Sequence, residues 1–282
     1  MRLDNIGILV FAYNRPSHLK RVLIAIEDYK ITSDIILIID GPKNRKDKVN
    51  QQNILAMANR FKKKNFKVIS RKKNLGLSKS IISGISFFSK KYKGIIVLED
   101  DVVPYRSFFQ FVSYFFEEYS KRRELSAICG YQFHNFYHSR ATKLGSVLLP
   151  NFTPWGWAIS AEKWKEYERS DRKSKFYKTS KIPSFFKKYL NKRFYARKKR
   201  DLWTLDFIYN NYLNNKFYVY PNFSLVKNIG FDGTGINSKV TDIFNVLDKY
   251  INTIDKKNYF LLNKKLVKKQ DNFFKKNIKY FY

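Results

Sequence analysis

One stretch of the sequence decides the fold: Gly94-Ile95-Ile96-Val97-Leu98-Glu99-Asp100-Asp101. Its aliphatic half is typical of a strand that is buried on both faces, and three carboxylates follow it directly. Like charges this close raise one another's pKa, so the triplet needs a positive group beside it. A divalent cation, which prefers oxygen ligands, is the simplest such group. The alternative is a solvated acidic turn at a strand end, and the triplet by itself leaves both interpretations open.

The sequence before this strand repeats a strand and then a helix. Strands are predicted at residues 6–11, 35–39, 66–69 and 94–98. Helices are predicted to begin at Pro16, after Gly76 and at Pro104, since proline suits a first helical turn. This alternation is typical of βαβ units with a largely parallel sheet, in which ligands bind beyond the carboxyl ends of the strands. The strand-end residues expected to face one crevice are Asn14, Asp40, Asn74 and Asp101.

The second half of the chain is less regular. We predict a strand at residues 126–129, a helix at 204–213 and a strand at 217–220. Between them lie an aromatic loop at 131–138, the segment Trp155-Gly156-Trp157 and a very basic stretch at 173–200. From residue 249 the chain becomes a lysine-rich and aromatic tail.

The composition indicates a globular protein with a strongly positive field. The chain has 282 residues, a hydrophobic fraction of 44% and a formal net charge of +33. Such a charge attracts polyanions, acidic membrane surfaces and phosphate-bearing molecules, but it selects partners by sign only. The single cysteine, Cys129, is expected to be a core residue in a reducing compartment. No secretory signal or apolar run of ~20 residues is evident. We therefore expect a cytoplasmic protein, or one at the inner face of the cytoplasmic membrane.

In order and spacing, several motifs resemble those of the GT-A glycosyltransferases. The likeness is closest to the N-acetylglucosaminyltransferase I branch and to bacterial family 2 enzymes of polysaccharide synthesis. It spans residues 6 to 238. The motifs are Phe11-Ala12-Tyr13-Asn14-Arg15-Pro16, Asp40-Gly41-Pro42, Asn74-Leu75-Gly76-Leu77, the acidic triplet, Trp155-Gly156-Trp157 and Asn228-Ile229-Gly230-Phe231.

The resemblance implies a GT-A (Rossmann-like) α/β fold, with a mostly parallel sheet flanked by helices. Residues 1–248 would form the glycosyltransferase domain, with a nucleotide-sugar half at 1–102 and an acceptor half at 103–248. Residues 249–282 would be the basic tail. The implied reaction is inverting transfer of a hexosyl or N-acetylhexosaminyl group from a nucleotide sugar, most often a UDP-sugar. The acceptor would be a glycan or lipid-linked glycan in bacterial cell-surface polysaccharide synthesis.

Carried over by position, the resemblance also implies roles for individual residues. Asp101 would bind Mn²⁺ or Mg²⁺, Asp100 would lie near the ribose and Glu99 near the transferred sugar. The donor-binding residues would be Ala12, Asn14, Arg15, Asp40, Arg71, Gly76, Glu99 and Asp100, with Asp40 on the base. For the segment at Gly76 the alternative is an ordinary turn before a helix. For Arg71, within a basic run, the alternative is a solvated face.

The acceptor side is predicted from aromatic and acidic residues. Asp206 is the expected catalytic base, with Asp201 and Asp171 in reserve. The alternative for Asp206 is a favourable charge at a helix start, two residues after a Thr204 N-cap. The acceptor-side residues would be Trp155, Gly156 and Trp157, with core packing as the alternative for the two rings. His134 and His138 are interpreted as structural or acceptor-side.

Two other functions remain open at this point. The first is binding of nucleic acid by the basic charge, although no nucleic-acid motif is present and no specific nucleic acid is expected. The second is a catalytically inactive relative that binds glycans. The basic tail could lie on an anionic membrane, or it could be a solvated tail or a C-terminal helix that packs on the domain.

Overall fold

The computed structural model describes residues 3–61, 63–133, 143–170, 203–234, 240–246 and 260–277. Four residues named above, His134, His138, Asp171 and Asp201, lie outside these ranges, as does the basic stretch 173–200.

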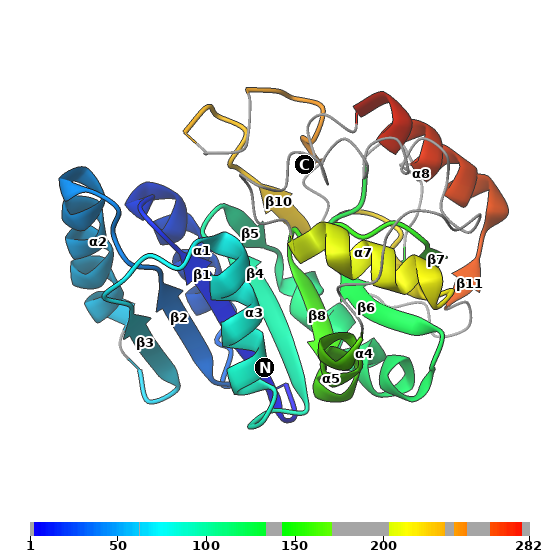
Figure 1. The fold of residues 1–282 in the computed structure, drawn as a ribbon, viewed down its shortest axis with the longest axis horizontal. Coiled ribbons are helices and arrows are strands. Elements are labelled where there is room, and N and C mark those ends of the chain that lie inside the picture. Colours follow the sequence, from blue (N-terminus) through cyan, green and yellow to red (C-terminus); the bar gives the residue numbers. More distant parts are fainter. Residues whose placement is uncertain are drawn as a thin grey trace.

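A nine-stranded sheet crosses the whole molecule in the order β11-β7-β9-β6-β8-β4-β1-β2-β3 (Figure 1). Its first half contains β1 (Ile6–Ala12), β2 (Ile35–Ile39), β3 (Phe66–Ser70) and β4 (Gly94–Glu99). All neighbouring strands in this half run parallel. β1, β2 and most of β4 are fully buried, as their continuous apolar runs predict, whereas β3 is an edge strand and is partly exposed. These four strands confirm the prediction to within one residue at each end.

The second half of the sheet mixes parallel and antiparallel neighbours. It contains β6 (Leu125–Cys129), β7 (Ser146–Leu149), β8 (Trp157–Ser160), β9 (Phe217–Pro221) and β11 (Leu261–Leu262). β8 runs antiparallel to both β4 and β6, and so joins the two halves of the sheet. β7 is also antiparallel to β9, whereas β6 and β9 are parallel. The sheet is therefore mostly parallel, as expected, with its antiparallel pairs confined to β8 and β7.

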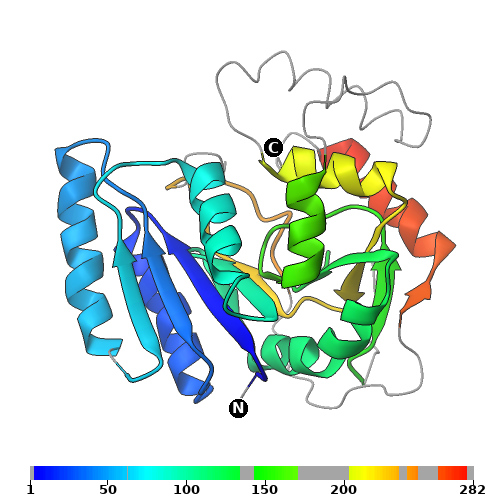
Figure 2. The same ribbon diagram turned by 60° about the horizontal axis from the view of Figure 1, so that its bottom comes forward.

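Helices cover both faces of the sheet (Figure 2). Their bounds are α1 (Pro16–Asp28), α2 (Arg45–Ala58), α3 (Leu77–Phe88), α4 (Arg106–Lys121), α5 (Ala161–Arg169), α7 (Trp203–Leu213) and α8 (Lys264–Asn277), with a 3₁₀ turn at Asn59–Phe61. α3 and α5 lie side by side, since Trp164 Nε1 donates to Ser86 Oγ at 3.0 Å. On the other face α1 meets α4 through the edge contact of Tyr29 with Phe109.

A short second sheet lies just beyond the carboxyl end of β4. It pairs β5 (Val102–Pro104) with β10 (Val226–Asn228) in antiparallel register. The prediction that Pro104 opens a helix is therefore wrong, because Pro104 ends β5 and α4 begins at Arg106. Proline is tolerated at this position because β5 is an edge strand, where a residue can lack an N–H donor. The pairing brings residues 226–228 directly onto the segment that follows the acidic triplet.

The basic tail packs against the domain over residues 260–277. β11 pairs with β7, and α8 buries Leu266, Gln270 and Phe274. Phe260 is 5% exposed and Phe274 is 1% exposed, so their rings cannot enter a membrane in this arrangement. The packed-helix alternative is therefore confirmed for this part of the tail. None of the helices in the described ranges is long and apolar enough to cross a bilayer.

Candidate active site

The acidic triplet lies at the carboxyl end of β4, next to the loop that follows β1. In the register of these two strands Glu99 is paired with Phe11, so the residues after Phe11 emerge beside Asp100 and Asp101. The backbone N–H of Tyr13 donates to Asp100 Oδ2 at 3.2 Å. Arg15, at the start of α1, reaches back so that its Nη2 lies 2.9 Å from Asp101 Oδ2 and also contacts Asp100 Oδ1. The fold thus brings together Arg15, Asp100 and Asp101, three of the predicted site residues.

Glu99 and Asp100, two carboxyl groups of the triplet, have raised pKa values. Burial raises the pKa of Asp100 although Arg15 opposes this effect, and burial together with Asp101 and Asp100 raises the pKa of Glu99. Arg15 is also affected: burial lowers its pKa, but the two aspartates outweigh this and hold the pKa above its ordinary value. Neighbouring carboxyl groups with raised pKa values are typical of functional sites. A bound cation would lower these pKa values, because it stabilises the charged form of each carboxylate.

The segment after β10 covers Asp101. The N–H of Ile229 donates to the backbone oxygen of Asp101 at 2.8 Å, which places Gly230 directly on the Asp101 side chain. A Cβ atom at Gly230 would lie 2.0 Å from Asp101 Oδ2. Only glycine therefore fits against the carboxylate in this position. The resemblance named this segment without giving it a role, and its contact with Asp101 could not be read from the sequence.

Asp40 organises the loop before α3. Its carboxylate accepts the backbone N–H groups of Gly41 at 3.0 Å, Leu75 at 2.9 Å and Gly76 at 2.9 Å. Asn74 closes the same loop by donating to the backbone oxygen of Gly41 at 2.7 Å. The expected convergence of the β2 and β3 loops is therefore present. Asp40 is only 7% exposed, and its oxygens are engaged by the backbone.

Ala12 ends β1, and Asn14 lies in the loop that follows it, between the triplet and Asp40. The oxygen of Ala12 accepts the N–H of Asp40 at 3.0 Å, and Asn14 Nδ2 donates to Asp47 Oδ1 at 2.6 Å. Asp47 also accepts the Tyr13 hydroxyl at 2.5 Å. Asp47 and Tyr13 were not predicted as site residues. Asn44 and Asp47 show the pattern of a helix N-cap, which α2 has, but this signal does not reveal that Asp47 fixes the loop after β1.

Arg71 points toward α3 in this structure. Its guanidinium contacts Ser80 Oγ and lies 3.0 Å from Ser83 Oγ. Burial lowers the pKa of Arg71, while the charge of Asp40 acts in the opposite direction. Arg71 is thus half-buried beside the Asp40 loop, rather than a fully solvated member of a basic run.

Trp155 and Trp157 belong to two aromatic clusters. Trp157 is fully buried and stacks on Trp203, with ring centroids 5.5 Å apart. Trp155 is 9% exposed and packs edge-on against Phe231, at 5.2 Å between ring centroids. The Trp157 ring therefore offers no surface to a sugar here, in line with the packing alternative. The Trp155 ring supports the segment that covers Asp101.

Gly156, between these two rings, allows two backbone segments to meet. Its φ is +64°, and its oxygen accepts the N–H of Gly130 at 2.6 Å. A Cβ atom at Gly156 would lie 2.8 Å from Val226 in β10. Backbone and side chains thus approach Gly156 closely, and one neighbour is the strand that leads to Gly230.

Asp206 lies in the first turn of α7, on the side of the sheet that α3 covers. α7 begins at Trp203, whose N–H donates to Ser78 Oγ at 3.3 Å. Ser78 is in the first turn of α3, directly after the Gly76 loop. The two helices therefore start next to each other. Because the helix begins at Trp203, Thr204 lies within it and is not its N-cap.

The carboxylate oxygens of the triplet suit a hard divalent cation. Few of the ligands of such an ion would come from the protein. Within the described ranges, no group of three or more His, Cys, Asp or Glu side chains converges so that it could hold a metal ion. A cage made by the protein alone is therefore not indicated there. Mg²⁺ and similar ions, however, are usually held by one or two carboxylates plus substrate phosphates. Asp101, whose side chain is 14% exposed, can supply such a carboxylate.

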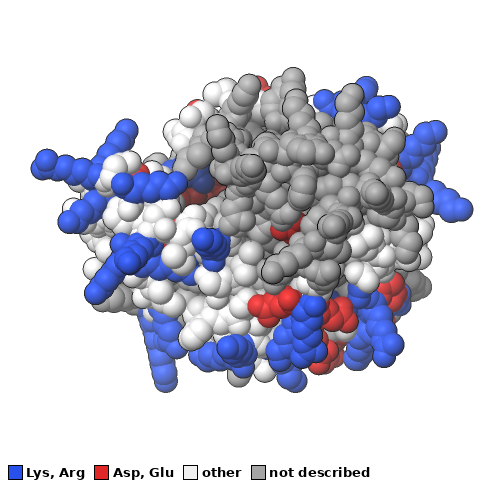
Figure 3. Space-filling view, viewed as in Figure 1, with Lys and Arg blue, Asp and Glu red and all other residues white. Residues whose placement is uncertain are grey.

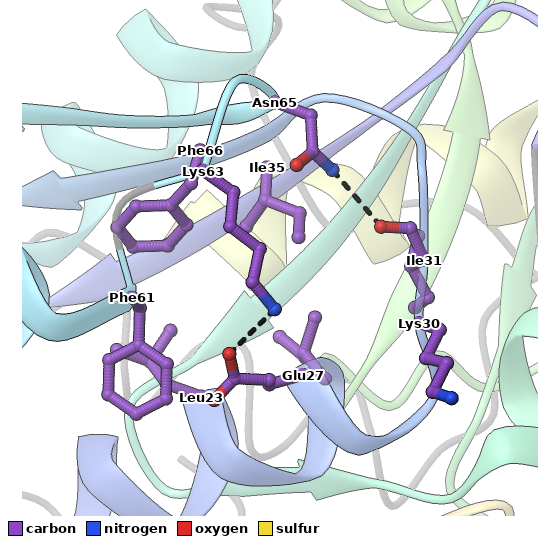
Figure 4. A pocket seen from close by; sticks show the side chains of 10 residues that line it. Leu23, Glu27, Lys30, Ile31, Ile35, Phe61, Lys63, Asn65 and Phe66 are labelled. Atoms are coloured by element: carbon purple, nitrogen blue, oxygen red, sulfur yellow. Dashed lines mark hydrogen bonds and ion pairs between the residues drawn. The ribbon is translucent and has the colours of Figure 1, made fainter.

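A pocket lies at the amino ends of β2 and β3, opposite the end of the sheet that carries the triplet (Figure 4). Ile35 and Phe66, the first residues of β2 and β3, line it together with Leu23 of α1 and Phe61. A strand of five residues is ~17 Å long, so this pocket is separated from the triplet by about the length of the strands. Lys63 and Glu27 pair at its mouth at 2.6 Å. We assign it no part in the site.

Comparison with known proteins identifies the family. The sequence pattern of Glycosyl transferase family 2 matches residues 7–194. No curated protein matches the chain.

Solved structures that match the chain include the following three. One is the mannosyltransferase PcManGT from Pyrobaculum calidifontis in complex with GDP-Man and Mn²⁺, with 10% identity, a TM-score of 0.39 and coverage of 56% of this chain and 45% of that one. S. aureus TarS 1-349 has 10% identity, a TM-score of 0.38 and coverage of 58% and 49%. Glucosyl-3-phosphoglycerate synthase from Mycobacterium tuberculosis, in complex with Mn²⁺, UDP-glucose and phosphoglyceric acid, has 12% identity, a TM-score of 0.36 and coverage of 56% and 57%.

The chain spans about half of the length of these structures. The family pattern, in contrast, covers both the parallel half of the sheet and the triplet at its edge. This chain belongs to Glycosyl transferase family 2.

Proposed function

We propose that this protein transfers a sugar, with inversion, from a nucleotide sugar to a glycan or lipid-linked glycan, with Mn²⁺ or Mg²⁺ as cofactor. One observation carries the proposal beyond family membership. Asp100 and Asp101 lie beside Arg15 at the end of β4, burial raises the pKa of Asp100, and Gly230 covers the Asp101 side chain. Buried carboxylates crowded in this way favour binding of a cation.

The residues after β1, β2 and β3 would hold the donor. Asp101 would hold the cation, which stabilises charge on the departing nucleoside diphosphate. The Gly76 loop opens α3, and free N–H groups at a helix start favour phosphate. Asp40, whose carboxylate accepts backbone N–H groups of this loop, would lie against the base of the nucleotide. We propose that this base is uracil. Asp100 and Glu99 would face the ribose and the transferred sugar.

Asp206 would remove the proton from the acceptor hydroxyl. A carboxylate can do this when it is within hydrogen-bond reach of that hydroxyl in the bound complex. The support is positional: α7 starts beside the first turn of α3, so Asp206 is on the same side of the molecule as the Gly76 loop. The acceptor half, 103–248, would then meet the donor half, 1–102, across the junction of β4 with β8.

The acceptor is proposed to be a glycan chain, lipid-linked where the protein acts at a membrane. Lysines of α8 whose side chains are exposed form a basic face: Lys264, Lys265, Lys268, Lys269, Lys275 and Lys276. Figure 3 shows such positive side chains over α8 and over α2. Lysine clusters gain ~1 kcal/mol per residue near an anionic surface. We propose peripheral attachment at the cytoplasmic face through this charge, with Leu261 and Leu262 exposed beside it.

A thermal-shift screen tests the function. Nucleotide sugars with uracil, guanine and other bases are added to the full chain with Mn²⁺ or with a chelator. The proposal predicts a rise in melting temperature with one donor class that requires Mn²⁺. If no nucleotide sugar shifts the melting temperature under either condition, the proposed donor site is wrong.

Membrane attachment has a separate test. The protein is sedimented with vesicles of anionic or of neutral lipid, as the native chain and with the six α8 lysines changed to glutamine. Only the native chain should pellet, and only with the anionic vesicles. Equal pelleting of both forms would exclude α8 as the attachment surface.

A further inference from the structure

The guanidinium of Arg15 is a positive charge that the protein itself places beside the triplet. A single nitrogen, Nη2, contacts both Asp100 and Asp101. The Arg15 side chain is 18% exposed, and the two aspartate side chains are 5% and 14% exposed. Among the residues that the structure describes, Arg15 alone forms an ion pair with the triplet. The protein therefore partly neutralises its own carboxylates before any ligand arrives.

This arrangement opposes binding of a metal ion on its own. A cation at Asp101 would lie ~2–2.2 Å from a carboxylate oxygen, and the guanidinium is fixed at 2.9 Å from Asp101 Oδ2. Positive charges this close repel each other. Arginine cannot relieve the repulsion by releasing a proton, since it stays charged in proteins. It can do so only by moving away or by gaining a negative partner.

A diphosphate is such a partner. Guanidinium groups bind phosphate oxygens with paired hydrogen bonds. Arg15 is at the N-cap position of α1, where its side chain makes no capping hydrogen bond. Turning the side chain from the carboxylates to a phosphate would leave the helix start intact. The two negative charges of the diphosphate, together with the Asp101 carboxylate, would then compensate the guanidinium and the divalent cation.

We propose that Arg15 is an internal counter-ion that makes binding of the divalent cation at Asp101 conditional on the diphosphate of the donor. This inference rests on the proposed function. Arg15 acts in it as a positioning residue, because it controls when the metal ion can be held. Metal and nucleotide then bind cooperatively, and each favours the other by the same factor.

The test is a titration of Mn²⁺ into the full chain, followed by the electron paramagnetic resonance signal of the free ion, without and with UDP. Two neutral variants are used, Arg15→Gln and Arg15→Met, so that one remains if the other does not fold. Arg15→Lys keeps the charge. Arg122→Gln is the matched control, since Arg122 also pairs with a carboxylate, that of Glu118 at 3.0 Å. It lies just after the far end of α4, a helix of ~24 Å.

Without UDP, the two neutral variants should bind Mn²⁺ at least tenfold more tightly than the native chain. Arg15→Lys and Arg122→Gln should bind it as the native chain does. The factor by which UDP tightens Mn²⁺ binding should fall at least tenfold in the neutral variants. Equal Mn²⁺ affinity of the native chain and a folded neutral variant overturns the inference, as does a tenfold gain in Arg15→Lys.

Failure of the proposed function gives a different result. In that case Asp101→Asn binds Mn²⁺ with UDP as well as the native chain does, because the triplet is not the metal site. The Arg15 variants would then show no change in either series.

Discussion

Adding one methyl group at Gly230 should disable the site. The Cβ atom of Gly230→Ala would lie 2.0 Å from Asp101 Oδ2 and 2.8 Å from Asp101 Cγ, whereas real Cβ contacts are essentially never under 3.0 Å. The carboxylate or the covering segment must therefore move by ~1 Å. A displacement of ~1 Å at a catalytic group can cost ~100-fold in rate. Overpacking of this kind also costs ~1–3 kcal/mol of stability.

The assay follows release of nucleoside diphosphate from the donor identified by the screen, together with the affinity for UDP in the presence of Mn²⁺. Gly233→Ala is the matched control. Gly233 has a φ of +87° and its Cβ would meet only Val240, at 3.1 Å, so this variant strains the same segment without touching Asp101. Both variants should lose stability toward urea, but only Gly230→Ala should lose kcat/KM by ~100-fold. A folded Gly230→Ala protein with native turnover would refute the assigned contact.

Three further outcomes concern other residues. Asp206→Asn should keep Mn²⁺-dependent donor binding in calorimetry and lose ~10²–10⁴-fold in turnover, while native turnover would remove Asp206 from the mechanism. Trp157→Ala should lower the free energy of unfolding by ~3–5 kcal/mol, since the ring is fully buried; a change in the acceptor KM with native stability would instead support sugar contact. Burial lowers the pKa of Lys163 to about 8, helped by the charge of Lys216. The unfolded pKa is ~10.4, so the unfolded chain binds more protons between these values and stability rises with pH there. Compared with Lys163→Met, the native chain should gain ~1–2 kcal/mol from pH 7.5 to pH 10 in urea denaturation, and a constant difference would contradict the burial argument.

The parallel half of the sheet could be predicted because three of its four strands are almost fully buried. Burial of β1, β2 and β4 requires continuous apolar runs, and such runs are visible in sequence. The antiparallel half carried weaker signals. No strand was predicted at β8, which is only four residues long and begins at Trp157, directly after the positive φ of Gly156. α2 was missed because it buries few apolar side chains, mainly Ile54 and Ala58.

The site could be predicted only as far as the strand ends define it. Parallel strands bring their carboxyl ends to one edge, so Asp40 and Asp101 were expected there from chain order alone. Chain order does not predict the contacts between segments that are joined by long connections. The hydrogen bond from Tyr13 to Asp47 joins residues 34 positions apart. The contact of Gly230 with Asp101 depends on the pairing of β5 with β10. Such pairings are decided by packing in three dimensions, and local sequence patterns do not encode them.

The central claim is that Asp101 holds a divalent cation for a nucleotide donor. The most direct measurement is titration of UDP into the native chain and into Asp101→Asn, each with Mn²⁺ and with a chelator. Asparagine keeps the shape of the side chain and removes its charge. We predict that UDP binds the native chain at least tenfold more tightly with Mn²⁺ than with the chelator, and that Asp101→Asn shows no such difference. An equal gain from Mn²⁺ in both proteins would contradict the account.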